Sequence, residues 1–252
     1  MTAEDDAELP FMAHLIELRT RLIKAVAAVM VVFLVLVPFA NRLYSILAGP
    51  LLAKMPPDTQ MIAIKVASPF LIPMKLAFFV AVLIAMPVVL YQLWAFVAPG
   101  LYRHERKLAL PILFSSIALF YIGCAFAFFL VLPTVFGFLQ SVAPEGVAVM
   151  TDIGEYLDFV LVIFFAFGFC FEVPVAVVIL SLLGWVTPKQ LGEARAYVVV
   201  ASFVIAAVLT PPDVVSQLML AIPMCILYEI GLLAARWLPP STRSIAGNEN
   251  GP

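Results

Sequence analysis

Charged residues are scarce in this chain. Asp, Glu, Lys and Arg make up 12% of its 252 residues, whereas soluble domains carry about a quarter. Hydrophobic residues make up 64%, and the mean hydropathy is +1.11. This composition excludes a water-soluble globular domain and predicts a membrane protein whose length is filled by spans and short loops.

Cysteine and histidine are also few and lie outside any pattern typical of a catalytic or metal site. Cys124, Cys170 and Cys225 lie in apolar runs without a CxxC pair, which favours small packing residues over disulfides or metal ligands. Both histidines lie outside these runs, and no Walker A sequence, HExxH motif or pair of intramembrane aspartates is present. We therefore expect no enzyme activity, no cofactor, no direct use of ATP and no nucleic-acid partner.

The start of the chain lacks the features of a secretory signal. Acidic residues stand where a signal would be basic, and no small-residue cleavage site follows the first apolar run. We expect this run to remain as a membrane anchor.

Long apolar runs account for most of the remaining sequence. A span needs about 20 mostly apolar residues, and the fold class predicted is an all-α integral membrane protein with six transmembrane helices, at about 22–40, 70–96, 108–132, 156–183, 196–209 and 214–235. Residues 1–21 are predicted to form a cytoplasmic tail and amphipathic segment, 22–240 the six-span membrane domain, and 241–252 a flexible cytoplasmic tail. The last two helices are expected to be short, and a fifth span of about 14 residues would rise only ~21 Å. Such a helix favours an open, cupped bundle over a closed ring.

Basic residues alternate between the two sides of the predicted spans. One set of flanks carries ten and the other carries four, and basic flanks are typically cytoplasmic. Both termini are therefore predicted to be cytoplasmic. The ten are Arg19, Arg21, Lys24, Arg103, Arg106, Lys107, Lys189, Arg195, Arg236 and Arg243, and the four are Arg42, Lys54, Lys65 and Lys75.

The segment before the first span has the pattern of an amphipathic helix. Its apolar stripe faces away from a polar side that includes Glu17 and Arg21, four residues apart. One interpretation is an interfacial helix that only anchors the first span. The other is that Glu17 offers a carboxylate to a cationic partner at the membrane surface.

The region between the second and third spans combines aromatic residues with one acid. Tyr91, Trp94 and Tyr102 are typical of an interfacial aromatic belt. An aromatic belt does not explain Glu105, which lies among basic residues and follows the apolar Phe96 in the sequence. A carboxylate beside an apolar surface suits a peptide with a guanidinium group followed by a hydrophobic stretch, because guanidinium binds carboxylate with two hydrogen bonds.

Two further acids lie within or beside the later spans. Glu172 is inside the fourth span, where a charge costs roughly 2.5–3.5 kcal/mol at the bilayer centre, and Pro174 is expected to kink the helix next to it. Glu172 is either a structural hydrogen-bonding group or a functional polar site. Asp213 follows two prolines and fits the N-cap of the sixth span, with Gln217 one turn further on.

Taken in order, these segments resemble the TatC family, the multi-span receptor subunits of twin-arginine protein translocases. The resemblance covers nearly the whole chain. It rests on HLIELR at 14–19, SPF at 68–70, YQLWAF at 91–96, HER at 104–106, FEVP at 171–174, LTPPD at 209–213 and AIP at 221–223.

The resemblance implies a role in moving folded cargo across the bacterial cytoplasmic (inner) membrane, driven by the proton-motive force. It implies that Glu17, Arg19, Phe96 and Glu105 bind twin-arginine signal peptides. It also implies that intramembrane polar residues contact single-span partner subunits of the TatA and TatB types, within a complex that holds more than one copy of this chain. These residues are Glu172, Thr210, Asp213 and Gln217.

Two other functions remain open from the residues themselves. A small-solute secondary transporter would explain Glu172, but it predicts internal repeats and a partner acid or base for Glu172 in another span, and we find neither in the sequence. A membrane assembly scaffold overlaps with the receptor role, since a receptor is also an assembly platform.

Overall fold

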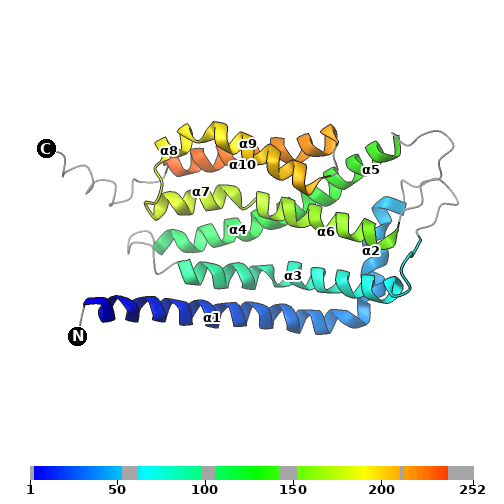
Figure 1. Ribbon diagram of the computed structural model, residues 1–252, viewed down its shortest axis with the longest axis horizontal. Coiled ribbons are helices and arrows are strands. Elements are labelled where there is room, and N and C mark those ends of the chain that lie inside the picture. Colours follow the sequence, from blue (N-terminus) through cyan, green and yellow to red (C-terminus); the bar gives the residue numbers. More distant parts are fainter. Residues whose placement is uncertain (1–2, 53–61, 98–105, 142–151, 211–212, 238–252) are drawn as a thin grey trace. The chain divides into compact units, whose positions relative to one another are not determined.

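The computed structural model describes residues 3–52, 62–97, 106–141, 152–210 and 213–237. These ranges are almost entirely helical (Figure 1), and their one extended feature is an isolated bridge between Ile62 and Asp152. The prediction of an all-α protein is confirmed. The helices are α1 (Ala3–Leu36), α2 (Ala40–Leu52), α3 (Ser68–Val97), α4 (Arg106–Phe126), α5 (Leu132–Ser141), α6 (Ile153–Cys170), α7 (Val173–Leu182), α8 (Pro188–Glu193), α9 (Arg195–Leu209) and α10 (Val214–Trp237), with a 3-10 turn at Val37–Phe39 and a π-helical turn at Ala127–Val131.

Five helical stretches among the described residues are long and apolar enough to cross a membrane. They are His14–Ile46, Ser68–Phe96, Leu110–Phe138, Ile153–Leu182 and Val214–Trp237. The remaining apolar helix, α9, has 15 residues and rises about 22 Å, which confirms that the fifth predicted span is short.

The expectation that the last span is also short was wrong. Helix α10 has 24 residues and rises about 36 Å. Helix α9 ends at Leu209, but α10 begins at Val214, directly after its Asp213 cap, and continues through Pro223 to Trp237. Of these two helices, only α9 is therefore short.

The chain divides into two compact units, the first formed by residues 1–44 and 73–113. In this unit α1 runs without a break across the predicted boundary at residues 21 and 22. Phe33 of α1 contacts Phe78 of α3 edge to face, with ring centroids 5.6 Å apart. Many apolar side chains of α1 point outward, including Leu22 and Leu34, which are 61% and 66% exposed. Such a helix surface requires lipid around it.

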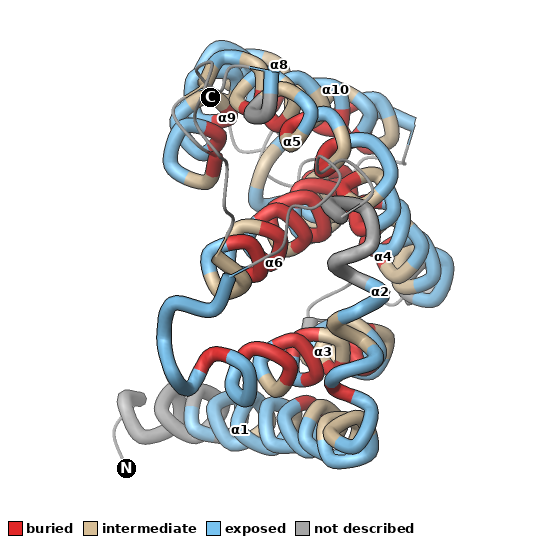
Figure 2. Tube along the Cα trace, turned by 90° about the vertical axis from the view of Figure 1, so that its right-hand side faces the viewer, coloured by how far each residue is buried: buried red, intermediate tan, exposed pale blue. Residues whose placement is uncertain are grey.

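The second unit comprises residues 45–72 and 114–252 and has α6 as its core. Buried residues run along most of α6 (Figure 2), and Leu157, Val160 and Ile163 are completely buried. Helix α4 approaches α6 closely, because a Cβ on Gly123 would lie 2.6 Å from the Phe167 carbonyl oxygen. Helix α10 packs on α7 in the same way, with Gly231 against the backbone of Pro174.

The N-terminus of α6 is tied to the segment before α3. Asp152 caps α6 by accepting from the Gly154 and Glu155 N–H groups, and its Oδ2 accepts from the Ile64 N–H at 3.0 Å. The Ile153 N–H donates to the Ile62 carbonyl at 2.9 Å. The connection between α1 and α3 is therefore ordered in part, by α2 and by this contact, while residues 53–61 lie outside the described ranges.

These hydrogen bonds predict that Asp152 contributes to the stability of the fold in a pH-dependent way. The Ile64 N–H above all, then the Glu155 and Gly154 N–H groups and the Lys65 charge, lower the pKa of the Asp152 carboxyl. A lowered folded-state pKa means that the carboxylate stabilises the fold above the unfolded-state pKa of about 3.9 and loses this effect as pH falls through the folded-state value. Asp152→Asn should therefore unfold at a lower temperature than the parent near pH 6, and the difference should shrink below pH 4. A difference that stays constant with pH would contradict this role.

Candidate functional site

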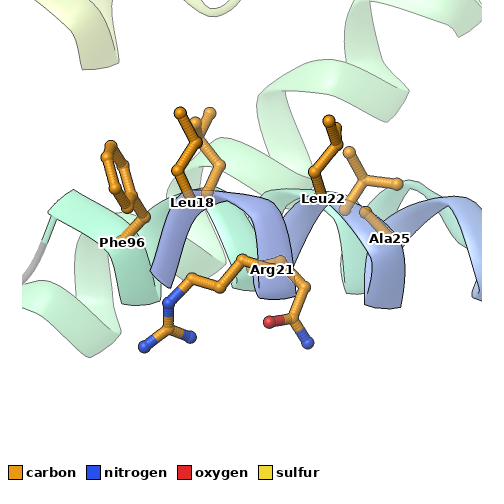
Figure 3. A pocket seen from close by; sticks show the side chains of 8 residues that line it. Leu18, Arg21, Leu22, Ala25 and Phe96 are labelled. Atoms are coloured by element: carbon orange, nitrogen blue, oxygen red, sulfur yellow. The ribbon is translucent and has the colours of Figure 1, made fainter. Parts of the chain in front are cut away.

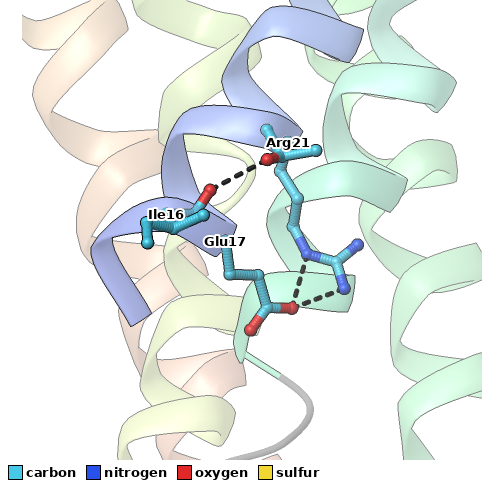
Figure 4. A network of polar contacts seen from close by, with 4 residues as sticks. Ile16, Glu17 and Arg21 are labelled. Atoms are coloured by element: carbon cyan, nitrogen blue, oxygen red, sulfur yellow. Dashed lines mark hydrogen bonds and ion pairs between the residues drawn. The ribbon is translucent and has the colours of Figure 1, made fainter. Parts of the chain in front are cut away.

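The carboxylate of Glu17 is held by a cation on its own helix. Arg21 donates from Nε at 2.9 Å and from Nη2 at 2.7 Å, and both bonds end on Oε1 of Glu17 (Figure 4). The spacing of four residues places the two side chains on one face of α1. Their side chains are 35% (Glu17) and 25% (Arg21) exposed. Within the described residues Oε2 of Glu17 makes no hydrogen bond, so the carboxylate keeps acceptor capacity.

An apolar groove between α1 and α3 lies beside this ion pair. It has a volume of about 150 Å³ and is lined by Leu18, Arg21, Leu22 and Ala25 of α1 and Val89, Gln92, Leu93 and Phe96 of α3. In Figure 3 the Leu18, Leu22 and Phe96 side chains point to one side, whereas the Arg21 guanidinium extends to the other. Arg21 therefore contributes to the groove and also holds the Glu17 carboxylate.

Phe96 lies at one end of the groove. Its ring stacks on the imidazole of His14, with centroids 4.2 Å apart and an interplanar angle of 24°. This contact fixes the end of α3 against α1, in the turn that precedes Glu17. Phe96 therefore lines the groove directly, whereas Glu17 is connected to it through Arg21.

Arg19, which was also predicted for this site, is not brought into it by contacts in the described part of the chain. Arg19 is exposed and makes no ion pair within the described part of the chain. Two residues along a helix turn the side chain by about 200° away from Glu17. Glu105 lies outside the described residues.

Glu172 has a buried partner that the sequence did not indicate. The chain leaves α6 at Phe171 and re-enters helix at Val173, which confirms the predicted kink beside Pro174. At this break the Ser116 Oγ of α4 donates to Oε2 of Glu172 at 2.6 Å. Oε1 is buried and has no partner among the described residues. Two adjacent serines in an otherwise apolar span, Ser115 and Ser116, were the available signal.

Thr210, Asp213 and Gln217 lie together at the junction of α9 and α10. Thr210 donates to the Ala206 carbonyl at 2.8 Å, and Asp213 Oδ1 accepts from the Ser216 N–H at 2.7 Å. Gln217 reaches across to donate to the Phe203 carbonyl of α9 at 3.2 Å. The capping interpretation of Asp213 is confirmed. Its Oδ2 is nevertheless buried with no hydrogen-bond partner in the described ranges.

These features define a multi-pass helical membrane protein with a carboxylate and an apolar groove shared by its first two long helices. The family model for "Sec-independent protein translocase protein (TatC)" matches residues 13–223. The chain belongs to the TatC family.

Individual relatives agree with this assignment. A TatC protein of Halothiobacillus neapolitanus is 56% identical over 93% of this chain, although the chain spans only 64% of that relative's length. A TatC protein of Escherichia coli is 53% identical over 94% of the chain and 91% of the relative. A crystal structure described as the twin arginine translocase receptor TatC matches 88% of this chain and 98% of its own, with a TM-score of 0.78 at 38% identity.

Proposed function

We propose that this chain is the receptor subunit of a twin-arginine protein translocase and that it binds twin-arginine signal peptides of folded cargo at its cytoplasmic face. The observation that carries the proposal is the Glu17 carboxylate bound to Arg21, a residue that also lines the apolar groove together with Phe96. A guanidinium group binds a carboxylate with two directed hydrogen bonds, and an apolar groove next to it suits the hydrophobic stretch that follows.

Glu105 and Arg19 complete the proposed peptide site. Glu105 would supply a second carboxylate, so that each arginine of the pair has its own acceptor. Arg19 belongs to the same segment as Glu17, and we expect it to shape the electrostatic field around the carboxylate rather than to bind a guanidinium group itself.

A second set of polar residues is proposed to contact single-span partner subunits of the TatA and TatB types within the bilayer. Glu172 and Asp213 each have a buried carboxylate oxygen without a partner in the described residues. Thr210 and Gln217 lie beside Asp213 and bind backbone carbonyls. Buried acceptors that lack donors are expensive in a membrane, and a donor from a partner helix would satisfy them after local rearrangement.

The remaining features follow from this role. We propose that the chain lies in the bacterial inner membrane with both termini in the cytoplasm, as the ten basic residues against four on alternate flanks indicate. We also propose that several copies assemble in the complex, that the bundle is cupped, and that the proton-motive force drives transport. The domain limits at 21/22 and 240/241 belong to the same proposal.

Binding of synthetic signal peptides tests the proposal. The detergent-solubilised chain should retain a peptide with two arginines followed by an apolar stretch at least tenfold more tightly than its twin-lysine counterpart. Glu17→Gln and Glu105→Gln should each lower the affinity for the arginine peptide by roughly 10- to 150-fold, since a hydrogen bond to a charged group contributes roughly 1.5–3 kcal/mol.

The control for these variants is Glu193→Gln, which removes an exposed acid on α8. It should leave peptide affinity unchanged. Equal retention of the two peptides would favour the alternative functions, a small-solute secondary transporter or an assembly scaffold. Unchanged affinity in both glutamate variants would overturn the site.

A further inference from the structure

The proposed peptide site is already occupied by a guanidinium group that belongs to the chain itself. Arg21 uses two nitrogens, Nε and Nη2, to bind Oε1 of Glu17 at 2.9 and 2.7 Å. This is the chemical group that a signal-peptide arginine would bring. No other basic residue among those described makes an ion pair with Glu17.

We propose that Arg21 is an internal competitor for the Glu17 carboxylate. Oε2 of Glu17 can accept a hydrogen bond with Arg21 in place, but a signal-peptide arginine that binds both carboxylate oxygens must displace Arg21 from Oε1. This inference rests on the proposed function. One guanidinium group replaces another, so the number of hydrogen bonds on Glu17 need not change. The binding-competent state is then the fraction of molecules in which the Glu17–Arg21 pair is open, and the apparent affinity is reduced by that fraction.

The position of Arg21 couples this exchange to the apolar groove. Its side chain lines the groove together with Leu18, Leu22 and Phe96, while its guanidinium is held at Glu17. Once the guanidinium is released, the aliphatic part of Arg21 is free to change rotamer. Binding of the peptide arginine therefore changes the wall of the groove that receives the residues after it.

An internal competitor changes the affinity of the site but not its selectivity. A competitor that closes the site lowers the affinity of every cationic peptide by the same factor, because it acts on the free receptor. Arg21 should therefore set the absolute affinity and leave the preference for arginine over lysine unchanged. That preference comes from the geometry of the carboxylate site.

Peptide binding to the full chain in lipid nanodiscs, at physiological salt, tests the inference. Arg21→Gln should raise the affinity for both the twin-arginine and the twin-lysine peptide by about 1.5- to 5-fold, the range expected for a partly exposed ion pair. The ratio of the two affinities should stay unchanged. Arg21→Lys should tighten both less, because an ammonium still competes but as a point charge.

The matched control is Lys24→Gln, which removes one positive charge from the same helix. Lys24 is exposed and lies seven residues from Glu17, or about 10 Å along the axis, beyond the Debye length of about 8 Å. It should leave both affinities unchanged. Equal tightening by Lys24→Gln would show a general charge effect and overturn the competitor role, as would unchanged or weaker binding in Arg21→Gln.

Failure of this inference is distinguishable from failure of the proposed function. If Glu17→Gln weakens binding but Arg21→Gln does not tighten it, the peptide site stands and the competitor role is wrong. If Glu17→Gln has no effect, the peptide site itself is wrong. In the double variant Glu17→Gln/Arg21→Gln, the increase in peptide affinity caused by removing Arg21 should disappear.

Discussion

Gly231→Ala is expected to lower the free energy of unfolding by about 1–3 kcal/mol, the usual cost of overpacking a tightly packed site. A Cβ at this position would lie 2.7 Å from the Pro174 Cα and 3.2 Å from both the Pro174 carbonyl oxygen and the Val177 Cβ. The nearest atom is backbone at the start of α7, so a side-chain rotation cannot relieve the contact. Helices α7 and α10 would have to move apart.

Gly137→Ala is the matched control, because a Cβ there meets nothing within 4 Å. Alanine in a helix interior is favoured over glycine by roughly 0.5–1 kcal/mol, so this variant should be as stable as the parent or more so. Thermal unfolding of the two variants in the same detergent measures the difference. If Gly231→Ala and Gly137→Ala melt at the same temperature, the close packing of α7 on α10 is not a source of stability.

The membrane-spanning helices could be predicted because long apolar runs are the strongest signal that a sequence contains. The break before Pro174 was predictable for a similar reason, since proline removes one backbone donor and crowds the preceding turn. The short α9 followed from the prolines after Thr210. The error at α10 was to describe the helix predicted at 214–235 as short, although that range is already long enough for a span of about 20 residues.

The contacts between helices could not be predicted in the same way. Helices α6 and α7 are apolar on all sides, so periodicity does not indicate which residue faces which neighbour. The contact between Gly231 and Pro174 and the bond from Ser116 to Glu172 both depend on the register of one helix against another. The bond from Ile64 to Asp152 joins residues 88 positions apart and has no local signature.

The Glu17 site could be predicted only in part. The pairing of Glu17 with Arg21 follows from their spacing on one helix, and the structure contains it. The groove and the stacking of His14 on Phe96 required α1 and α3 to lie side by side, which no local pattern indicates. The carboxylate and the aromatic residue could therefore be identified separately, and the packing of the two helices brings Phe96 and Arg21, the partner of Glu17, to the same groove.

Ser116→Ala is expected to destabilise the protein by about 1–3 kcal/mol, the cost of leaving a buried polar group without its partner. Ser116 is almost fully buried and provides the 2.6 Å hydrogen bond to Oε2 of Glu172, whose Oε1 already lacks a partner among the described residues. Removing the hydroxyl leaves both oxygens unsatisfied inside a span, where no water replaces the donor. Unfolding in detergent and export of a twin-arginine cargo in cells would both measure the loss.

Ser115→Ala is the control for this change, because Ser115 is the neighbouring serine of α4 but is exposed. Its loss should change stability by less than about 0.5 kcal/mol.

Glu172→Gln keeps a group that can accept from Ser116, so it should cost less stability than Ser116→Ala if hydrogen bonding is the main role of the carboxyl. A double-mutant cycle between Ser116→Ala and Glu172→Gln should then give a coupling of roughly 0.5–3 kcal/mol. Additive effects, or equal stability of the two serine variants, would mean that Glu172 does not depend on Ser116. A loss of export in Glu172→Gln at unchanged stability would instead assign the carboxyl to contact with a partner subunit.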